Sequence, residues 1–482
     1  MITNSAVTQS IFGNYVKSSI ESYFGRLNYD YKGKYFLQAS YRIDGQSSLA
    51  NSKKYGTFPG ASVGWRLVQE KFWQSVPFLQ KNVSEFKIKA SYATVGNRLG
   101  GFPYLSTFGS RPYGNVSGIA VAAIGNPDLQ WEQSKKYDIG FELGLLNNRI
   151  NLTFDYFKND LDNLVLAVPQ PFSMGVPLNQ INQNIGRVQN KGVEFTLNAT
   201  LVRKKDFEWN FNFNYTNVKN KIVSLYSIAG VPVTEIFPSN YNINRVGEAI
   251  NSIFGYEFAG VNSGNGNPVY YNAGGQLVQR NIQTGGYHFA NSMSDPTLGA
   301  ATSLTVADKK ILGSAQPTDF GAFTNTFSYK GFELDVMFRY QSGNKIVNIT
   351  RQEVLLNQRF ANSGTEILNR WTTPGQITDV PKLWYAQDAV INQNLETISR
   401  FVEDGKFLRL QNIVLSYNVD SKKLKDISNN AIKSARFFIQ AQNVHVWTKY
   451  RGIDPEAYSE DGQDNNISPQ VRNMSIGVTL GL

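Results

Sequence analysis

Residues 206–218, DFEWNFNFNYTNV, decide the fold class of this chain. Aromatic side chains occupy every second position: Trp209, Phe211, Phe213 and Tyr215. Amide and hydroxyl side chains fill the positions between them: Asn210, Asn212, Asn214 and Thr216. Successive side chains of a β-strand point to opposite faces of the sheet. One face of this strand therefore suits lipid and the other suits water, as in a strand that crosses a membrane.

The same alternation recurs along the chain. Large apolar residues alternate with polar ones in three further segments, residues 86–92, 150–156 and 193–201. A single alternating strand is weak evidence, because any half-buried antiparallel strand has period two. The repetition in many segments of roughly ten residues, the length a tilted strand needs to cross a bilayer, makes the membrane interpretation the better one.

The connections between these segments alternate between short and long. Tight turns are predicted at Lys32-Gly33, Asn147-Asn148, Arg203 to Asp206 and Lys330-Gly331. Long links are predicted at 45–60, 96–131, 161–189, 219–251, 342–405 and 446–470. Outer-membrane barrels have short periplasmic turns and long external loops. The pattern thus supports the barrel independently of the alternation.

We predict fourteen clear strands, near 22–31, 34–44, 61–68, 85–95, 134–146, 149–160, 191–202, 206–218, 252–261, 320–330, 331–342, 406–419, 434–445 and 471–482. If every short turn is periplasmic, the segments 252–261 and 320–330 both run downward, so one upward strand is missing between them. We place it at 267–280, which brings the total to fifteen. The predicted fold class is an all-β transmembrane antiparallel β-barrel. A barrel with both ends in the periplasm needs an even number of strands, so another segment or chain should complete the sheet.

Composition excludes several classes of protein. The 482 residues include no cysteine and two histidines, His288 and His445, so disulfides and thiolate sites are impossible and a metal or acid/base centre is not expected. There is no run of about 18 apolar residues, and no secretory signal is visible at the start. The net charge of +10 is spread singly among strands and turns, so no nucleic-acid partner is expected. We expect no enzyme activity and no cofactor.

Several ordered motifs resemble one family. They are RLNYDYKGKYFLQASYRIDGQSS at 26–48, FPGASVGWRLVQEKFW at 58–73, FKIKASYATVGN at 86–97, the stretch NPDLQWEQSKKYDIGFELGLLNNRINLTFDYF at 126–157, NIGRVQNKGVEFTL at 184–197, DGKFLRLQNIVLSYNV at 404–419 and AQNVHVWTKYRGIDPEAY at 441–458. The chain is similar in these motifs to the SusC/RagA family of TonB-dependent outer-membrane transporters. The resemblance spans nearly all of its length.

The resemblance implies a twenty-two-stranded barrel in the bacterial outer membrane, closed by an N-terminal plug and lidded by a SusD-type surface lipoprotein. Residues 1–482 would be the C-terminal part of this barrel, from strand eight to strand twenty-two. The plug, the first strands and the segment that binds TonB have no counterpart here, so this chain alone is not expected to couple to TonB. The region NSGNGNPVYYNAGGQLV lacks the carboxylates of a calcium loop found in many members, and the chain ends in Leu482 where an aromatic residue is usual.

Substrate-binding residues are expected among aromatic side chains in the long links, which could stack on sugar rings or peptide side chains. The candidates are Trp371, Trp384, Tyr385, Tyr450 and Tyr458. The competing interpretation is that these residues form an interfacial girdle or contact the lid.

Carboxylate-rich stretches have less informative interpretations. The segment DPEAYSEDGQD at 454–464 could hold calcium, but its spacing fits a solvated external loop better. Asp160 and Asp162 could form a glycosidase pair, but no acid/base partner lies nearby and solvent-facing side chains are expected. The Gly264-Asn265-Gly266 string has no strand-to-helix context for binding phosphate, so it is expected to be a loop.

The leading hypothesis is active import of an oligosaccharide or oligopeptide, captured between the barrel loops and the SusD-type lid. Two other classes stay open. One is a passive porin or structural barrel associated with a surface or secretion complex, and the other is a soluble β-sandwich that binds glycans. A plug-bearing N-terminal polypeptide in the intact assembly would favour import over the porin. Solubility without detergent would favour the sandwich.

Overall fold

The computed structural model describes residues 17–114, 116–228, 231–356, 362–384, 396–420, 424 and 431–481. The chain divides into two compact units. The first holds the residues up to Val63, Ala90–Tyr137 and Asn159–Val188. The second holds Gly64–Lys89, Asp138–Lys158 and Gln189–Leu482.

Thirteen long strands form the main sheet, in the order β1-β2-β3-β4-β7-β8-β9-β10-β22-β23-β26-β27-β29. Their bounds are β1 Ile20–Tyr31, β2 Tyr35–Gln46, β3 Tyr55–Arg66, β4 Val83–Asn97, β7 Glu132–Leu145, β8 Ile150–Pro169, β9 Gln180–Arg203, β10 Phe207–Ser224, β22 Asp319–Tyr329, β23 Phe332–Ser342, β26 Phe407–Asn418, β27 Ser434–Thr448 and β29 Asn473–Gly481. Two short helices, α1 (Lys71–Gln74) and α2 (Pro77–Asn82), connect β3 to β4. The order follows the chain, as expected for an up-and-down antiparallel sheet.

Strand registers in the second unit assign each side chain to one of two faces. Residues paired across antiparallel strands share a face. One row of paired residues crosses six strands from β10 to β29: Trp209, Phe327, Leu334, Leu415, Ile439 and Ile476. The neighbouring row on the opposite face is mainly polar: Asn210, Thr326, Asp335, Val414, Gln440 and Ser475. We call the face of the first row the apolar face and the face of the second row the polar face.

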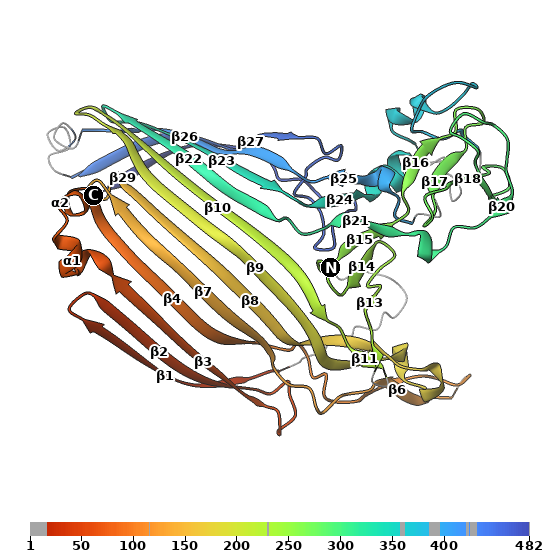
Figure 1. The fold of residues 1–482 in the computed structure, drawn as a ribbon, viewed down its shortest axis with the longest axis horizontal. Coiled ribbons are helices and arrows are strands. Elements are labelled where there is room, and N and C mark those ends of the chain that lie inside the picture. The colour runs from red at the N-terminus through yellow and green to blue at the C-terminus, as the bar shows by residue number, and fades with distance from the viewer. Residues whose placement is uncertain are drawn as a thin grey trace, which may run out of the picture. The chain divides into compact units, whose positions relative to one another are not determined.

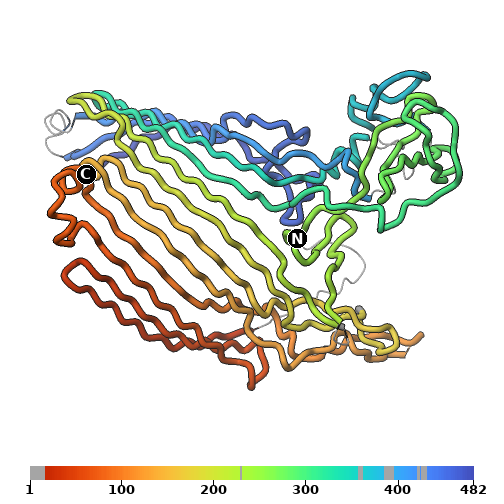
Figure 2. Tube along the Cα trace, viewed as in Figure 1, coloured from red at the N-terminus to blue at the C-terminus, as the bar shows by residue number. Residues whose placement is uncertain are grey.

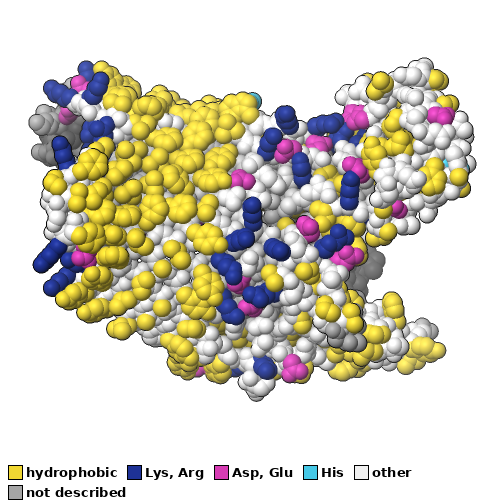
Figure 3. Space-filling view, viewed as in Figure 1, with side chains coloured by type: hydrophobic (Ala, Val, Ile, Leu, Met, Phe, Trp, Pro, Cys, Tyr) yellow, Lys and Arg dark blue, Asp and Glu magenta, His cyan; other side chains and the backbone are white. Residues whose placement is uncertain are grey.

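The apolar face is uncovered. Leu415 is 46% exposed, Ile439 51% and Ile476 82%, although each is a large aliphatic residue. Figure 3 shows hydrophobic side chains gathered in a continuous field over β10 and its neighbours, with Lys and Arg side chains beyond its left border. An exposed apolar surface that spans several strands is unfavourable in water and suits hydrocarbon. The predicted outward row at Trp209 to Tyr215 lies on this face and is not packed inside a core.

The predicted tight turns are confirmed. Lys32-Gly33, Asn147-Asn148 and Lys330-Gly331 each have positive φ at both residues, from 47° to 89°. This backbone conformation belongs to the type I′ turn, whose twist matches that of the flanking strands. The turn between β9 and β10 closes with Lys204 N–H donating to the Phe207 carbonyl at 2.8 Å.

Two predicted strands do not belong to the main sheet, and the predicted total of fifteen is wrong by these two. Residues 252–261 form β15 (Ser252–Gly255) and β16 (Phe258–Val261), and residues 267–280 form β17 (Pro268–Tyr271) and β18 (Leu277–Arg280), all in smaller sheets. All four residues of β15 are buried, so it lacks the one-sided exposure of a membrane-crossing strand. Without these two segments, successive strands of the main sheet alternate in direction and no strand is missing, because β10 pairs antiparallel with β22.

The predicted link at 161–189 is mostly strand. β8 and β9 run well past their predicted ends, to Pro169 and from Gln180. Among the described residues, no helix is long and apolar enough to span a membrane.

Long connections of the second unit fold into small sheets. One sheet contains β13 (Glu235–Ile236), β14 (Asn242–Arg245), β15 and β21 (Lys310–Ser314). Another contains β16, β17, β18, β19 (Tyr287–Phe289) and β20 (Ala301–Thr302), and a third contains β25 (Val402–Asp404), β24 (Lys345–Asn348) and β28 (Gln463–Asp464). Figure 1 shows β16, β17, β18 and β20 gathered in a lobe beyond the ends of β22 and β23.

The lobe has its own hydrophobic core. Its buried members are Tyr256, Tyr270, Leu356, Ile398 and Phe401. Segments distant in sequence lie side by side in it, the green stretch near 260 and the cyan stretch near 370 in Figure 2. The Trp371 indole N–H donates to the Ser263 carbonyl at 2.9 Å, and Lys382 N–H donates to the Gly266 carbonyl at 3.0 Å. The long links of this unit are thus folded structure with a core of their own.

The first unit has a smaller core against its strands. It consists of Leu49, Phe58, Leu129 and Trp131, with Phe58 and Trp131 in edge-to-face contact at 5.4 Å. A Cβ at Gly96 would lie 2.2 Å from the Phe58 ring, so glycine is required there for the ring to pack. The remaining short strands are β5 (Thr107–Ser110) with β6 (Ile119–Ala123) in this unit, and β11 (Ser227–Ile228) with β12 (Val231–Pro232) in the second unit.

Candidate functional site

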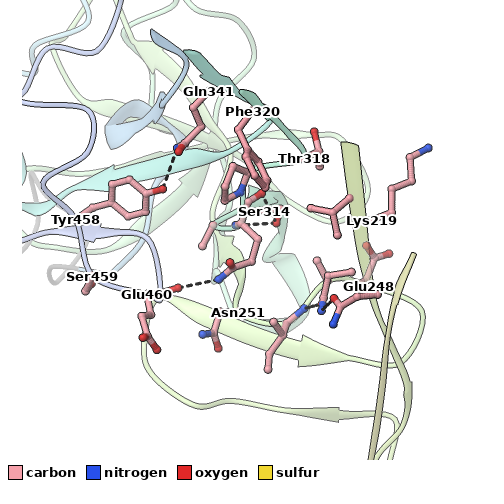
Figure 4. A pocket seen from close by; sticks show the side chains of 18 of the residues that line it. Lys219, Glu248, Asn251, Ser314, Thr318, Phe320, Gln341, Tyr458, Ser459 and Glu460 are labelled. Atoms are coloured by element: carbon pink, nitrogen blue, oxygen red, sulfur yellow. Dashed lines mark hydrogen bonds between the residues drawn. The ribbon is translucent and has the colours of Figure 1, made fainter. Parts of the chain in front are cut away.

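A pocket of about 920 Å³ lies in the second unit where β10, β22 and β23 end. Its walls come from six separate stretches of chain: Asn190, Val218–Asn220, Gly247–Asn251, Ser314–Thr318 with Phe320, Arg339 with Gln341, and Glu456–Glu460 without Ala457. Phe320 and Gln341 are paired on the polar face of the main sheet. Figure 4 shows Phe320, Gln341 and Tyr458 on one side of the pocket, and Glu248 and Asn251 on another.

The lining of the pocket combines amides and hydroxyls with two aromatic rings. Asn220 donates to Asn190 Oδ1 at 2.7 Å and accepts the Ile250 N–H at 2.8 Å. Gln341 donates to the Tyr458 hydroxyl at 3.1 Å. These bonds fix the orientation of the polar groups before a ligand arrives. Phe320 keeps 37% of its surface exposed, so an apolar ring face stands beside polar edges, the combination that suits sugar rings and peptide side chains.

Segment 454–464 is anchored to the polar face, and the prediction of a solvated loop is wrong. Arg409 donates to Asp454 at 2.5 Å and lies 2.7 Å from Glu456, while Arg339 lies 2.8 Å from the other oxygen of Glu456. Asp454 is 4% exposed. Two arginines on the polar face of β23 and β26 supply the countercharges that allow these carboxylates to be buried. Among the described residues, no group of three His, Cys, Asp or Glu could hold a metal.

Tyr458 is the one predicted substrate-binding residue that lines this pocket. Its hydroxyl accepts hydrogen bonds from Gln341 and from Asn344, the latter at 3.3 Å. Burial raises the pKa of Tyr458 above its usual range, so the hydroxyl stays neutral at physiological pH.

The other predicted aromatic residues lie elsewhere. Trp371 is 7% exposed and is held in the lobe by its bond to Ser263. Trp384 packs against Ile282, with the Lys382 ammonium 5.2 Å from its ring centroid. Tyr450 is 6% exposed and donates to Asp464. Tyr385 lies outside the described residues.

Asp160 and Asp162 do not face solvent as predicted. Asp160 is 4% exposed. Asp162 lies 2.9 Å from Arg187 and 2.8 Å from Lys135. These cations on neighbouring strands compensate the charges, so the carboxylates are structural ion-pair partners. The Gly264 to Gly266 string forms a turn in which Asn265 donates to Gln279 at 2.9 Å.

Sequence reasoning missed most of the pocket. Lys219, Glu248, Asn251, Phe320 and Gln341 were not singled out, because each is an ordinary residue in its own stretch. One signal was available for Phe320, an aromatic residue out of phase with the apolar row on β22. The others come together only through strand register and loop folding.

Comparisons with known proteins agree on one family. Residues 2–341 match the family model for the TonB-dependent receptor-like β-barrel. The chain is 32% identical, over 98% of its length, to TonB-dependent receptor P3 of Formosa agariphila, and 26% identical, over 96%, to TonB-dependent receptor SusC of Bacteroides thetaiotaomicron. It covers 47% and 44% of these two proteins, so it spans about half the length of its relatives.

A solved structure matches the fold over the same extent. The RagAB peptide transporter superposes with a TM-score of 0.80 at 25% identity, over 96% of this chain and 48% of the matched chain. The RagAB peptide importer in its open-open state also gives a TM-score of 0.80. The chain belongs to the TonB-dependent receptor-like β-barrel family of the outer membrane.

Proposed function

We propose that this chain provides barrel strands and external loops of a TonB-dependent importer that takes up oligomeric nutrients across the outer membrane. The observation that carries the proposal is the likeness to RagAB over 96% of the chain, a protein described as a peptide transporter. The likeness to SusC over the same extent supports it. The remaining half of the relatives' length would supply the plug and the contact with TonB.

The polar face supports a wet conduit. Across six strands it presents amide, hydroxyl and charged side chains, while the apolar face presents aliphatic and aromatic ones. A barrel with this division has lipid outside and water inside. The pocket at the ends of β10, β22 and β23 opens on the polar face, so a nutrient bound there would lie at the entrance to the conduit.

A SusD-type surface lipoprotein is the proposed partner, with an oligosaccharide or an oligopeptide as the cargo. The folded loops of the second unit would provide part of the surface that such a lid covers. The pocket suits either cargo, because hydroxyls of sugars and amides of peptides both exchange hydrogen bonds with Asn, Gln, Ser and Thr side chains.

Energy dependence is the direct test of import. Bacteria that produce the full-length protein are given fluorescent oligosaccharides and oligopeptides, with and without a protonophore and with and without the tonB gene. An importer accumulates one class of cargo only in energised tonB-positive cells. Uptake that persists in both treatments would show a passive porin and contradict the proposal.

A further inference from the structure

A buried arginine in the lobe lacks hydrogen-bond partners at one edge of its guanidinium group. Arg400 lies in the short 3-10 helix Ser399–Phe401, and its side chain is 3% exposed. It lines a pocket of about 410 Å³ together with Phe258, Ser399, Asp379, Lys449 and Arg451, among others. This pocket is separate from the one at the ends of β10, β22 and β23 and shares no lining residue with it.

Two phenyl rings hold the guanidinium group. Its central carbon lies 5.8 Å from the Phe258 ring centroid and 5.0 Å from the Phe401 centroid. Contacts of this kind restrict the plane of the guanidinium without using its N–H donors. The orientation of the group is therefore set before any ligand arrives.

The Nε and Nη2 atoms of Arg400 have no hydrogen-bond partner among the described residues. Asp379 Oδ2 lies 3.8 Å from Nε, and Glu366 Oε1 lies 3.9 Å from Nη2. Both distances are beyond a hydrogen bond. Nε and Nη2 share one edge of the guanidinium plane, and this edge is the one that binds two oxygens of a carboxylate or a tetrahedral anion side by side.

A second buried arginine in the same cluster shows what a complete set of partners looks like. Arg351 is also 3% exposed; it donates from Nε to Glu366 at 2.8 Å and from Nη1 to Glu403 at 3.3 Å and to the Arg400 carbonyl at 2.9 Å. The Arg451 N–H donates to Glu403 at 2.7 Å. The buried Glu403 and the partly exposed Glu366 are thus engaged by other groups. Burial lowers the pKa of Arg400 to about 10, with Asp379 opposing part of that effect, so the group is still charged at neutral pH.

Charges of both signs line the mouth of the pocket. Lys449 and Arg451 are exposed on its wall. Two of its three acids are engaged by other cations, Asp404 by Lys406 at 3.3 Å and Glu403 by Arg351 at 3.3 Å. Asp379 is the carboxylate nearest Nε, but its side chain is 53% exposed and makes only ion contacts of 3.8 Å. An exposed side chain held this loosely can turn toward solvent at little cost.

We propose that Arg400 forms the base of an oxyanion-binding subsite, which accepts a carboxylate or sulfate group when Asp379 turns aside. Lys449 and Arg451 attract the anion, and the Nε and Nη2 edge binds it through two parallel hydrogen bonds. The carrier of the anionic group, a peptide with a free C-terminus or an acidic or sulfated sugar, rests on the proposed import function. The subsite itself does not.

Binding to the full-length protein purified in detergent tests the subsite without any transport. Sodium sulfate and sodium acetate are titrated separately by calorimetry at constant ionic strength. The expected result is saturable binding of at least one of the two anions. Asp379→Asn should tighten it by about threefold to tenfold, because a competing carboxylate is removed. Glu353→Gln changes the net charge equally on an exposed residue outside the pocket and should leave the affinity unchanged.

Removal of the paired Nε and Nη2 donors of Arg400 gives the second part of the test. Arg400→Lys keeps the charge but not the two parallel donors, so it should weaken binding at least about tenfold. If this variant does not fold, Lys449→Gln on the exposed wall replaces it, with an expected loss of about twofold to fivefold. The proposal is overturned if neither the parent nor Asp379→Asn binds either anion saturably. An anion affinity that is unchanged both in Asp379→Asn and in the Arg400 or Lys449 variant would also overturn the proposal. Internal water would then satisfy the Arg400 donors.

Matched ligands then identify the carrier. A peptide acid is compared with its amide, and a sulfated disaccharide with its unsulfated form. Tighter binding of either anionic member, lost in Arg400→Lys, supports the proposal and names the class. Equal binding within both pairs contradicts it. Failure of the import proposal has a different signature, uptake that is independent of the protonophore and of tonB.

Discussion

Arg409 secures segment 454–464 through two acids that have almost no access to water. Its side chain and that of Asp454 are each 4% exposed, and that of Glu456 is 9% exposed. Breaking a buried pair by removing one partner costs about 3–5 kcal/mol, because the remaining charge is left uncompensated. Arg409→Met is therefore expected to release residues 454–464 from the polar face while the strands remain folded.

Hydrogen exchange measured by mass spectrometry checks this prediction. Amides in 454–464 should exchange much faster in Arg409→Met than in the parent, whereas those of β27 should not change. Arg436→Met serves as the control, because Arg436 is 41% exposed and contacts Glu333 at 3.1 Å. Unchanged protection of 454–464 in Arg409→Met would show that the ion pairs do not hold the segment.

Phe320 is expected to contribute to cargo binding through its exposed ring. Loss of a ring that stacks on a ligand costs about 0.5–1.5 kcal/mol beyond the area buried. Phe320→Ala should therefore weaken cargo binding by about threefold to tenfold or more. The matched control is Tyr329→Ala, an exposed aromatic residue at the other end of β22 and outside the pocket. Equal effects of the two variants on the affinity for the imported cargo would argue against the pocket as its site.

Single residues were the scale at which the sequence was least informative about function. Tyr458 was predicted as a binding residue and lines the pocket, but Trp371 and Tyr450 are buried and donate hydrogen bonds to Ser263 and Asp464. The carboxylates at 454–464 looked solvated because their partners, Arg339 and Arg409, lie on other strands. Pairing between distant residues depends on strand register and on the path of the loops. Neither can be predicted from the residues that neighbour each carboxylate in the sequence.

The long strands show the opposite situation, since their two faces can be read from consecutive residues. Ile439 and Gln440 are neighbours on β27 and belong to the apolar and polar faces respectively. An arginine on the lipid side of a barrel strand costs about 2–4 kcal/mol near the midplane of the bilayer and much less on the water side. We expect Ile439→Arg to be strongly destabilising and Gln440→Arg to be tolerated.

Folding into phospholipid vesicles measures this difference. The folded fraction is followed through a urea titration by the mobility of unheated samples in SDS gels. The midpoint should fall clearly for Ile439→Arg and stay near that of the parent for Gln440→Arg. Similar midpoints would place residues 439 and 440 in similar surroundings and contradict the assignment of faces.

Strand prediction worked where one face meets lipid and failed where both faces are covered. Thirteen of the fifteen predicted strands are in the main sheet, because hydrocarbon and water fix the residue types on their faces. β15 and β17 are short, and most of their residues are buried, so their apolar residues report a small local core. The predicted strand at 267–280 depended on the predicted strand at 252–261, so the two errors have the same cause.

The lobe of the second unit should loosen in acid. Arg351 lowers the pKa of Glu366 by hydrogen bonding to its carboxylate. A carboxyl group whose pKa is lower in the folded state stabilises that state above its unfolded pKa of about 4.3, and this stabilisation is lost as the pH falls through the folded value. Protection of residues 350–356, corrected for intrinsic exchange, is expected to drop as the pH falls below about 4.3. Glu366→Gln should remove most of this pH dependence; an identical profile in the variant would assign it to another group.

At the scale of the whole molecule, everything proposed depends on the apolar face lying in hydrocarbon while the polar face lines water. The chain contains no cysteine, so nitroxide labels can be attached to single cysteines introduced in it. Five consecutive positions of β23, Glu333 to Met337, alternate between the polar and apolar faces by their register with β22. Met337 is informative because it is an apolar residue on the polar face.

Collision rates of these five labels with oxygen, which concentrates in lipid, and with a water-soluble nickel chelate test the central claim directly in reconstituted vesicles. The account predicts high oxygen and low nickel accessibility at Leu334 and Val336, and the reverse at Glu333, Asp335 and Met337. Uniform accessibility along the strand, or a pattern that followed residue hydrophobicity at Met337 and not the alternation, would contradict it.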